Sequence, residues 1–268
     1  MKKGMPGFPP GFPFNVGDSF GQQQDPKNPK IHGAGNLPGG KYETLEIRGA
    51  GKVAGDVEAR SIRLSGAATI NGDVKAGVLE TSGAGTVAGR IVADELTTSG
   101  SLTARRSIKA GTFDARGAFS TGGDVEAKTT FRARGGFAVD GRIKAKEIEI
   151  ELNGRCRAKA LEAPKISVKR SGSFSGSSGG AAISVSITGA GATGGVNVVS
   201  GGSSGSEGTL EVETIEGDTV SLEATHAECV TGKRVQIGAG CEIQRVEYTV
   251  ELKVDEKAKV EKSEKVGK

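Results

Sequence analysis

Residues 42–110 read YETLEIRGAGKVAGDVEA, RSIRLSGAATINGDVKA, GVLETSGAGTVAGRIVA and DELTTSGSLTARRSIKA when the chain is cut after each recurring alanine. The same cut gives GTFDARGAFSTGGDVEA, KTTFRARGGFAVDGRIKA and KEIEIELNGRCRAKALEA over residues 111–163. Every segment is 17 or 18 residues long. A fixed period of this length indicates stacked repeats, because a single repeat of this size cannot bury its apolar side chains alone.

Four columns of apolar residues run through the aligned segments. The first column is Leu45, Ile62, Leu79, Leu96, Phe113, Phe131, Ile148 and Ile166. The second, two residues later, is Ile47, Leu64, Thr81, Thr98, Ala115, Ala133, Ile150 and Val168. The third is Val53, Ile70, Val87, Ala104, Thr121, Val139 and Cys156. The fourth is Val57, Val74, Ile91, Ile108, Val125, Ile143 and Leu161, each followed two residues later by alanine.

The spacing inside each run is two residues, which is the period of a strand and not of a helix. The runs end at glycines such as Gly49, Gly66 and Gly83, where the chain can bend without a Cβ penalty. The sequence therefore predicts an all-β protein, a parallel β-helix over residues 42–170 with coils of 17–18 residues. Its backbone groups would pair with the coils above and below at a spacing of about 4.8 Å.

The flanking segments lack this period. Residues 1–41 are rich in Gly, Pro, Gln and Asn and are expected to form a disordered N-terminal tail. Residues 171–208 contain 12 Gly and 11 Ser, which predicts a flexible insertion or linker, with a strand pair within 183–199 as the alternative. Residues 209–254 again alternate like strands and predict further coils, whereas residues 255–268 read as a charged tail.

The C-terminal coils are predicted from a 15-residue spacing. The residues that set it are Val220, Val235 and Val250, together with Leu222, Ile237 and Leu252.

Composition limits the classes of function. With 36 basic and 32 acidic residues that alternate in most coils, the chain lacks the basic patch typical of nucleic-acid binding. Three cysteines without CxxC spacing argue against a disulfide framework or a zinc site and fit a reducing cytoplasm. No apolar stretch follows Lys2 and Lys3, so neither an export signal nor a membrane span is expected.

Catalytic chemistry finds little support. His32 lies in the predicted tail, and His226 is close to Cys229 in sequence, but no third group is suggested that would orient a nucleophile–base pair. The GAG stretches lack the following helix that a phosphate-binding loop requires. The sequence therefore predicts no catalytic residue, no cofactor, no metal and no small-molecule substrate, so the chain is not expected to be an enzyme.

The GDV-x-A coils resemble those of the bactofilins, polymer-forming bacterial cytoskeletal proteins. The residues that carry the resemblance are Gly55–Ala59, Gly72–Ala76 and Gly123–Ala127, and the block IEGDTVSLEATHAECVTGKRVQIGAGCEIQRVEY is similar to the C-terminal part of longer Gram-positive members. The resemblance implies a right-handed β-helix with disordered tails, nucleotide-independent end-to-end polymerisation, and a place in the cytoplasm or on the inner face of the membrane. The Gly/Ser insertion departs from the compact members and leaves open whether residues 209–254 stack coaxially.

The functional prediction is a structural cytoskeletal scaffold whose partners are other copies of itself, with the inner membrane surface and cell-wall or morphogenesis proteins as further partners. An open parallel stack leaves unpaired backbone groups at its ends, which are templates for another strand. The predicted self-association residues are Leu45, Ile47, Val53, Val57, Val235, Ile237, Val250 and Leu252. The residues predicted to touch a membrane or partner are Phe8, Phe12 and Phe14, against the alternative that this segment is incidental low-complexity sequence.

Two rival functions remain at this point. Hexapeptide-repeat acyltransferases stack coils of similar length but use a catalytic histidine at a subunit groove, and neither His32 nor His226 falls within residues 42–170. An exported β-helical fibre or adhesin is the second, and it would need an export signal.

Overall fold

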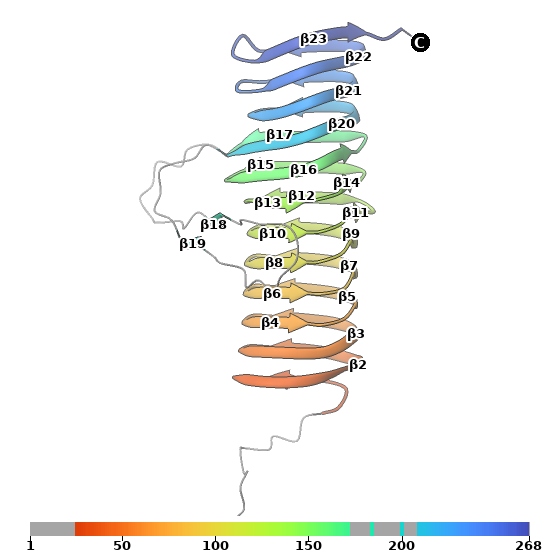
Figure 1. Cartoon of the computed structure of the whole chain (residues 1–268). Coiled ribbons are helices and arrows are strands. Elements are labelled where there is room, and N and C mark those ends of the chain that lie inside the picture. Colours follow the sequence, from red (N-terminus) through yellow and green to blue (C-terminus); the bar gives the residue numbers. More distant parts are fainter. Residues whose placement is uncertain (1–24, 172–182, 185–198, 201–207, 268) are drawn as a thin grey trace, which may run out of the picture.

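A computed structural model describes residues 25–171, 183–184, 199–200 and 208–267. The described chain is all-β and forms a parallel β-solenoid of about 12 turns with a spacing of about 17 residues (Figure 1). Apart from one short hairpin, its strands belong to a single 21-stranded sheet that winds around the rod. This confirms the fold class predicted from the repeat.

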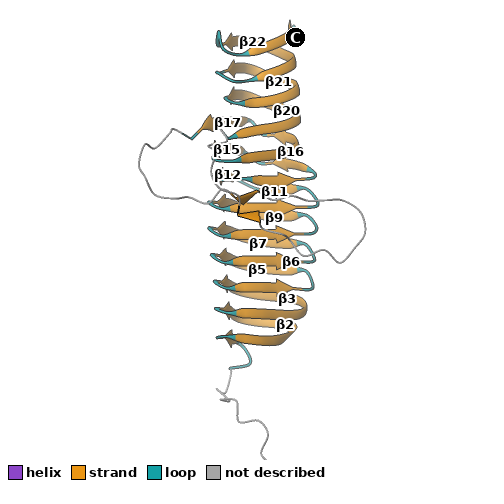
Figure 2. Ribbon diagram, turned by 60° about the vertical axis from the view of Figure 1, so that its left-hand side comes forward, coloured by secondary structure: helices purple, strands orange, loops and turns teal. Residues whose placement is uncertain are grey.

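Most strands follow one another through short loops at the corners of the rod (Figure 2). In the N-terminal part they are β1 Lys30–Ile31, β2 Ala34–Ile47, β3 Ala50–Leu64, β4 Ala67–Ile70, β5 Val74–Thr81, β6 Ala84–Val87, β7 Ile91–Thr98, β8 Ser101–Ala104 and β9 Ile108–Ala115. Next come β10 Ala118–Thr121, β11 Val125–Ala127, β12 Thr130–Arg134, β13 Phe137–Val139, β14 Arg142–Lys144, β15 Glu147–Leu152, β16 Arg155–Glu162 and β17 Lys165–Arg170. The last are β18 Ile183–Ser184, β19 Val199–Ser200, β20 Thr209–Leu222, β21 Thr225–Ile237, β22 Glu242–Val254 and β23 Lys259–Lys265.

Each coil contributes to three faces of the rod. Face A is the stack built on Leu45–Ile47, where Leu45 pairs with Ile62 and Ile47 with Leu64. Face B is the stack built on Ala50–Val53, and face C the stack built on Val57–Ala59. All these pairings are parallel, so the apolar columns of the sequence become continuous ridges inside the rod.

The interior contains a further inward column on face B that the repeat did not reveal. Its members differ widely in size and are Gly51, Ala68, Gly85, Leu102, Phe119, Phe137, Cys156 and Leu210. Cys156 therefore stacks on Phe137 and not on Val139, which corrects the predicted third column by two residues.

Size complementarity explains this variable column. Where face A carries the large Ile47, the facing position is Gly51, whose added Cβ would lie 2.6 Å from an Ile47 methyl carbon. Where face A carries the small Ala115, the facing side chain is Phe119, which packs on Phe113 with ring centroids 5.0 Å apart. In these two coils a large side chain on one face is thus matched by a small residue on the other, as a close-packed interior requires.

The GDV motif has a structural reason. At the corner between faces B and C, the side chain of Asp56 accepts a hydrogen bond from the backbone N–H of Asp73 in the next coil at 2.7 Å. Asp73 in turn accepts from the N–H of Arg90 at 2.7 Å, and Asp124 from the N–H of Arg142 at 2.9 Å. The aspartate thus satisfies a backbone donor at the bend, where the ladder is interrupted.

The turn glycines between faces A and B stack tightly on one another. A Cβ on Gly83 would lie 2.2 Å from the carbonyl oxygen of Gly66 in the coil below.

We expect Gly83→Ala to lower the free energy of unfolding by about 1–3 kcal/mol, because the coils must move apart to admit a methyl group. Gly40→Ala is the matched control, since its Cβ would meet nothing closer than 3.6 Å. Urea unfolding followed by circular dichroism measures both, and equal losses would contradict the crowding argument.

Two threonines occupy inward positions on face A. Thr81 and Thr98 are 2% and 0% exposed, and among the described residues their hydroxyl oxygens have no hydrogen-bond partner. We expect Thr98→Val to raise the free energy of unfolding by about 1 kcal/mol, because a buried hydroxyl without a partner is replaced by a methyl group of similar shape. Thr97→Val, one residue away on the outer surface, should change the free energy of unfolding little, and urea unfolding measures both variants. A destabilised Thr98→Val protein would show that the hydroxyl is satisfied.

The solenoid begins earlier than the sequence predicted. The predicted tail 1–41 is wrong from Lys30 onward, because β1 pairs with Glu46–Ile47 and β2 pairs with β3 along its length. The glycines and the proline of this segment gave no strand pattern in the sequence. Pro38 nevertheless lies in the terminal strand of face B, where a missing N–H is tolerated. Of the rest of the predicted tail, residues 1–24 lie outside the described residues.

The C-terminal part also differs from the prediction. Val220 stacks on Val235 as expected, but a register shift between Gly232 and Arg234 places Leu252, not Val250, on Val235. Val250 consequently points away from the core and is 54% exposed. The predicted charged tail is wrong as well, because β23 pairs with β22 over most of its length. Alternating Lys and Glu are compatible with a terminal strand because only one edge of it is paired.

The insertion does not break the stack. The chain leaves face A after β17 and returns on face B at Thr209, where β20 pairs with both β16 and β17. The open question of coaxial stacking is therefore settled: residues 209–254 continue the same rod. Within the insertion, β18 and β19 form an antiparallel pair, which was the alternative to an unstructured linker. The described residues contain no helix that could cross a membrane.

Candidate functional site

One side groove is lined by titratable side chains. It has a volume of about 560 Å³ and lies on face B of the C-terminal coils, where His226 stands between Glu211 and Glu242 in the ladder. Cys229 is not part of the lining; its sulfur faces the Thr231 hydroxyl at 3.9 Å. The described residues thus bring no cysteine to His226, and no group of them could hold a metal ion.

The cysteines differ in accessibility. Cys156 is fully buried and donates a hydrogen bond to the carbonyl oxygen of Gly135 at 3.2 Å, and burial raises the pKa of its thiol to about 12. Burial also raises the pKa of the Cys241 thiol, whereas Cys229 is partly exposed.

The three thiols should therefore differ in reactivity. Because the thiolate is the reacting form, we expect one fast-reacting thiol when native protein is titrated with Ellman's reagent at pH 8, and two more only after unfolding. Cys229→Ser should remove the fast phase, and a fast phase that remains would contradict this assignment.

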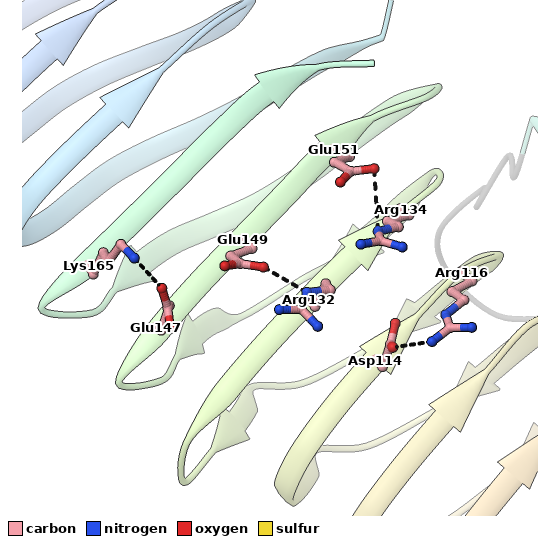
Figure 3. A network of polar contacts seen from close by, with 8 residues as sticks. All are labelled: Asp114, Arg116, Arg132, Arg134, Glu147, Glu149, Glu151 and Lys165. Carbon is pink, nitrogen blue, oxygen red and sulfur yellow. Dashed lines mark hydrogen bonds and ion pairs between the residues drawn. The ribbon is translucent and has the colours of Figure 1, made fainter. Parts of the chain in front are cut away.

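The outer side of face A carries a ladder of ion pairs (Figure 3). Arg132 contacts Glu149 at 2.7 Å and Lys165 contacts Glu147 at 2.6 Å, each pair joining neighbouring coils. Asp114 in β9 pairs with Arg116, which directly follows that strand, at 2.9 Å. These side chains are substantially exposed, so each pair contributes little to stability. What they do is keep the sides of the rod hydrated.

Face C repeats the alternation. Glu58 is bound by Lys75 at 2.9 Å and by Lys41 at 3.0 Å, and hydrogen bonds from both ammonium groups lower the pKa of its carboxyl. The pattern is broken at Val92, which stands between Lys75 and Lys109 and is 43% exposed.

Most of the predicted self-association residues lie inside the stack and not at its ends. Those with at most 2% exposure are Leu45, Ile47, Val53, Val57, Val235 and Ile237. A charge at Ile47 would therefore disrupt the interior and would not test an end contact. Leu252 is half-buried near the C-terminal end, and Val250 points to solvent. Phe8, Phe12 and Phe14 lie outside the described residues.

Four other residues at the ends were missed. At the N-terminal end Ile31 continues the Ile47 column and Leu37 the Val53 column. At the C-terminal end Val254 continues the column of Ile237, and Val260 that of Ile243. Extending the 16–17-residue period into residues 30–41 and 254–265 would have found them, despite the Gly, Pro and charged residues between.

Comparisons with known proteins give partial similarities only. No family model matches the chain, and no solved structure matches it. The chain is 44% identical over 57 residues to the uncharacterized protein YhbE of Bacillus subtilis (strain 168), which is 21% of this chain and 24% of that protein. It is 40% identical over 60 residues to the uncharacterized protein YhbF of the same organism, which is 22% of this chain and 26% of that protein. The chain thus spans about a quarter of the length of the curated relatives that it matches.

Proposed function

We propose that this chain is a structural scaffold that assembles end to end into filaments without nucleotide, as its resemblance to the bactofilins implies. The observation that supports the proposal is that no other described strand pairs with the outer edge of the first or the last coil. A row of unpaired N–H and C=O groups is a template for another strand, and the two ends lie at opposite extremes of the rod (Figure 1).

The N-terminal end is small and apolar. Its terminal strand segments are β1 on face A and the first part of β2 on faces B and C. Leu37 and Tyr42 pack only partly against the core, and the Tyr42 hydroxyl donates to the carbonyl oxygen of Pro38 at 2.7 Å. No charged side chain of the described residues points into the core at this end, so none of them repels an incoming coil from the inner side.

The C-terminal end exposes apolar surface beneath a charged edge. Val254 is 45% exposed although its column faces the core, and Tyr248, Leu252 and Val260 are only partly buried. An added coil would bury these side chains, which is favourable by about 25 cal/mol per Å² of apolar surface. The lysines and glutamates of β23 make pairing with a further strand less favourable but do not block the backbone groups of this edge.

The size of such a contact sets the expected affinity. Each end presents one coil of about 17 residues, slightly fewer than the 20–30 residues per side of a standard interface. Assembly is therefore expected to depend on concentration. Once a filament forms, its sides are free to bind partners, for which morphogenesis proteins and the inner membrane surface are the proposed classes.

Sedimentation velocity and negative-stain electron microscopy of the purified full chain, without nucleotide and over a range of concentration, test the proposal. We expect rods that lengthen as concentration rises. A protein that stays monomeric at every concentration and salt level would overturn it.

A further inference from the structure

We propose that the outer side of face B is a docking surface for this chain's own insertion, whose hairpin of β18 and β19 packs there over β10. The surface is a stripe of small side chains on the outside of neighbouring strands. The proposal goes beyond end-to-end assembly and does not depend on it, because it concerns the side of the rod and a single copy of the chain.

The docking surface, called here the face B stripe, consists of the outward residues of β4, β6, β8 and β10. They stack in two columns through the parallel registers and are Ala67, Thr69, Ala84, Thr86, Ser101, Thr103, Ala118 and Ser120. None of these strands contains a charged residue, whereas ion pairs line the outer sides of faces A and C. A flat surface of small uncharged side chains allows a second β-layer to approach to about 10 Å between backbones.

One strand of the face B stripe is covered on its outer side. In β4, β6 and β8 the inward residues are buried and the outward ones are half-buried or exposed, but every residue of β10 is buried. Ala118 and Ser120 are 6% and 5% exposed, although they share their columns with the half-buried Ser101 and Thr103. Outward side chains of a sheet become buried where another layer lies on them, so this burial marks the position of an occupant.

The described side chains around β10 do not account for this burial. In its column Ser120 lies between Thr103 and Ala138, which are both small. The long side chain that precedes the strand, Arg116, is held on face A by its ion pair with Asp114. The occupant therefore comes from a segment outside the coils.

The insertion has the length and the anchor points to reach this surface. It leaves face A after Arg170 and returns on face B at Thr209, and residues 201–208 connect β19 to that point. In the face B ladder β10 lies three steps below β20, through β16 and β13, which is about 14 Å. The connecting residues span up to about 26 Å when extended, so the hairpin reaches β10 with length to spare. By the same spacing β4 lies about 29 Å below β20, at the limit of this reach.

The position of the hairpin agrees with this reach. In Figure 1 β18 and β19 lie beside the rod at the height of β10, and in Figure 2, where that side comes forward, they lie in front of the rod between β9 and β11. An isolated two-stranded hairpin is only marginally stable in water, so the antiparallel pairing of β18 with β19 requires a supporting surface. The sequence ISVSI at residues 183–187 alternates apolar and hydroxyl residues, the pattern of a strand with one buried side.

Hydrogen exchange of full-length Ser120→Arg protein tests the surface. The rod accepts an arginine in this column, because Arg157 occupies it two coils higher, but the new side chain would stand where the hairpin packs. We expect the amides of residues 183–200 to exchange on the order of 10-fold faster than in the parent protein, while β8, β10 and β13 keep their protection. Thr69→Arg, in the same column on β4, is the matched control and should leave the hairpin protected. A hairpin without protection in the parent protein, or one equally protected in Ser120→Arg, would overturn the docking.

Thiol cross-linking identifies the copy that supplies the hairpin. In a Cys229→Ser background, Ser184→Cys is combined in one full-length chain with Ala138→Cys, a half-buried position directly above Ser120. A short bismaleimide spans the distance of about 10 Å between two packed layers. We expect a monomer with a 138–184 link, identified by mass spectrometry, and no link when Thr69→Cys replaces Ala138→Cys.

The remaining outcomes of the cross-linking would overturn the proposal. Equal links to both positions would show a hairpin that is not held at β10, and the absence of any link would show a hairpin held elsewhere. Dimers in a mixture of the two single-cysteine proteins would assign the face B stripe to the hairpin of a second copy instead of the chain's own.

Discussion

Phe131→Ala is expected to lower the free energy of unfolding by about 3–5 kcal/mol, the largest effect of any single truncation in the rod. Phe131 is completely buried and lies at the centre of an aromatic cluster, with ring centroids 5.4 Å from Phe113, 5.9 Å from Phe119 and 6.1 Å from Phe137. A coil held by ladders on both sides cannot collapse inward to fill the space. The cavity therefore remains and its cost is not recovered.

Urea unfolding and native-state hydrogen exchange measure this change. Because stability in a solenoid is local, the loss of amide protection should centre on β9 to β15 and fade toward both ends. Arg132→Ala, next in sequence but on the outer surface, should cost at most about 1 kcal/mol even though it removes the pair with Glu149. A uniform loss of protection along the rod would contradict the picture of independent coils.

Val254→Glu is expected to raise the concentration needed for assembly on the order of 100-fold while leaving the monomer folded. The free side chain is 45% exposed, so a carboxylate is tolerated in the isolated rod. In the filament it would be buried against an apolar side chain at a cost of about 3 kcal/mol, which corresponds to that factor.

Val92→Glu is the matched control for this prediction. Val92 has nearly the same exposure, 43%, but lies on the outer side of face C between two lysines. Val92→Glu should leave the concentration needed for assembly unchanged and raise the free energy of unfolding slightly, because the carboxylate lies between two lysines. Sedimentation velocity of both variants gives the comparison, with circular dichroism to show that each is folded. If Val254→Glu assembled like the parent protein, the C-terminal end would not be the contact.

The interior of the rod could be predicted from the sequence because each column repeats. Leu45, Ile62 and Leu79 occupy one environment many times, so the 17-residue period identifies both strand and face. The inward column of Gly51 and Phe119 escaped because its members compensate for their neighbours in size and share no residue type. Such a column shows no apolar pattern in the sequence, although the size of each residue is determined by the side chains around it.

The ends escaped for a different reason. A terminal coil is paired on one edge only, so Pro38 is tolerated there although it would remove a ladder hydrogen bond from an inner coil. In β23 the alternating lysines and glutamates leave few apolar residues to show the period. The error at Val250 has a local cause. The step from β20 to β21 is 15 residues, whereas the step from β21 to β22 begins at 16 and the shift after Gly232 lengthens it to 17, so the 15-residue spacing does not continue.

The corner between Arg170 and Thr209 gives the rod a site for a label. Because β20 pairs directly with β16 and β17, the coils stay joined across this corner. A small tag domain inserted between these two residues should therefore project from the side of the rod without separating the coils. About 12 turns at about 4.8 Å give each subunit a length of roughly 55–60 Å. A tagged filament should therefore show a lateral density at that axial repeat in averaged micrographs, all tags leaning in one sense if the subunits share a direction, and in pairs if they alternate.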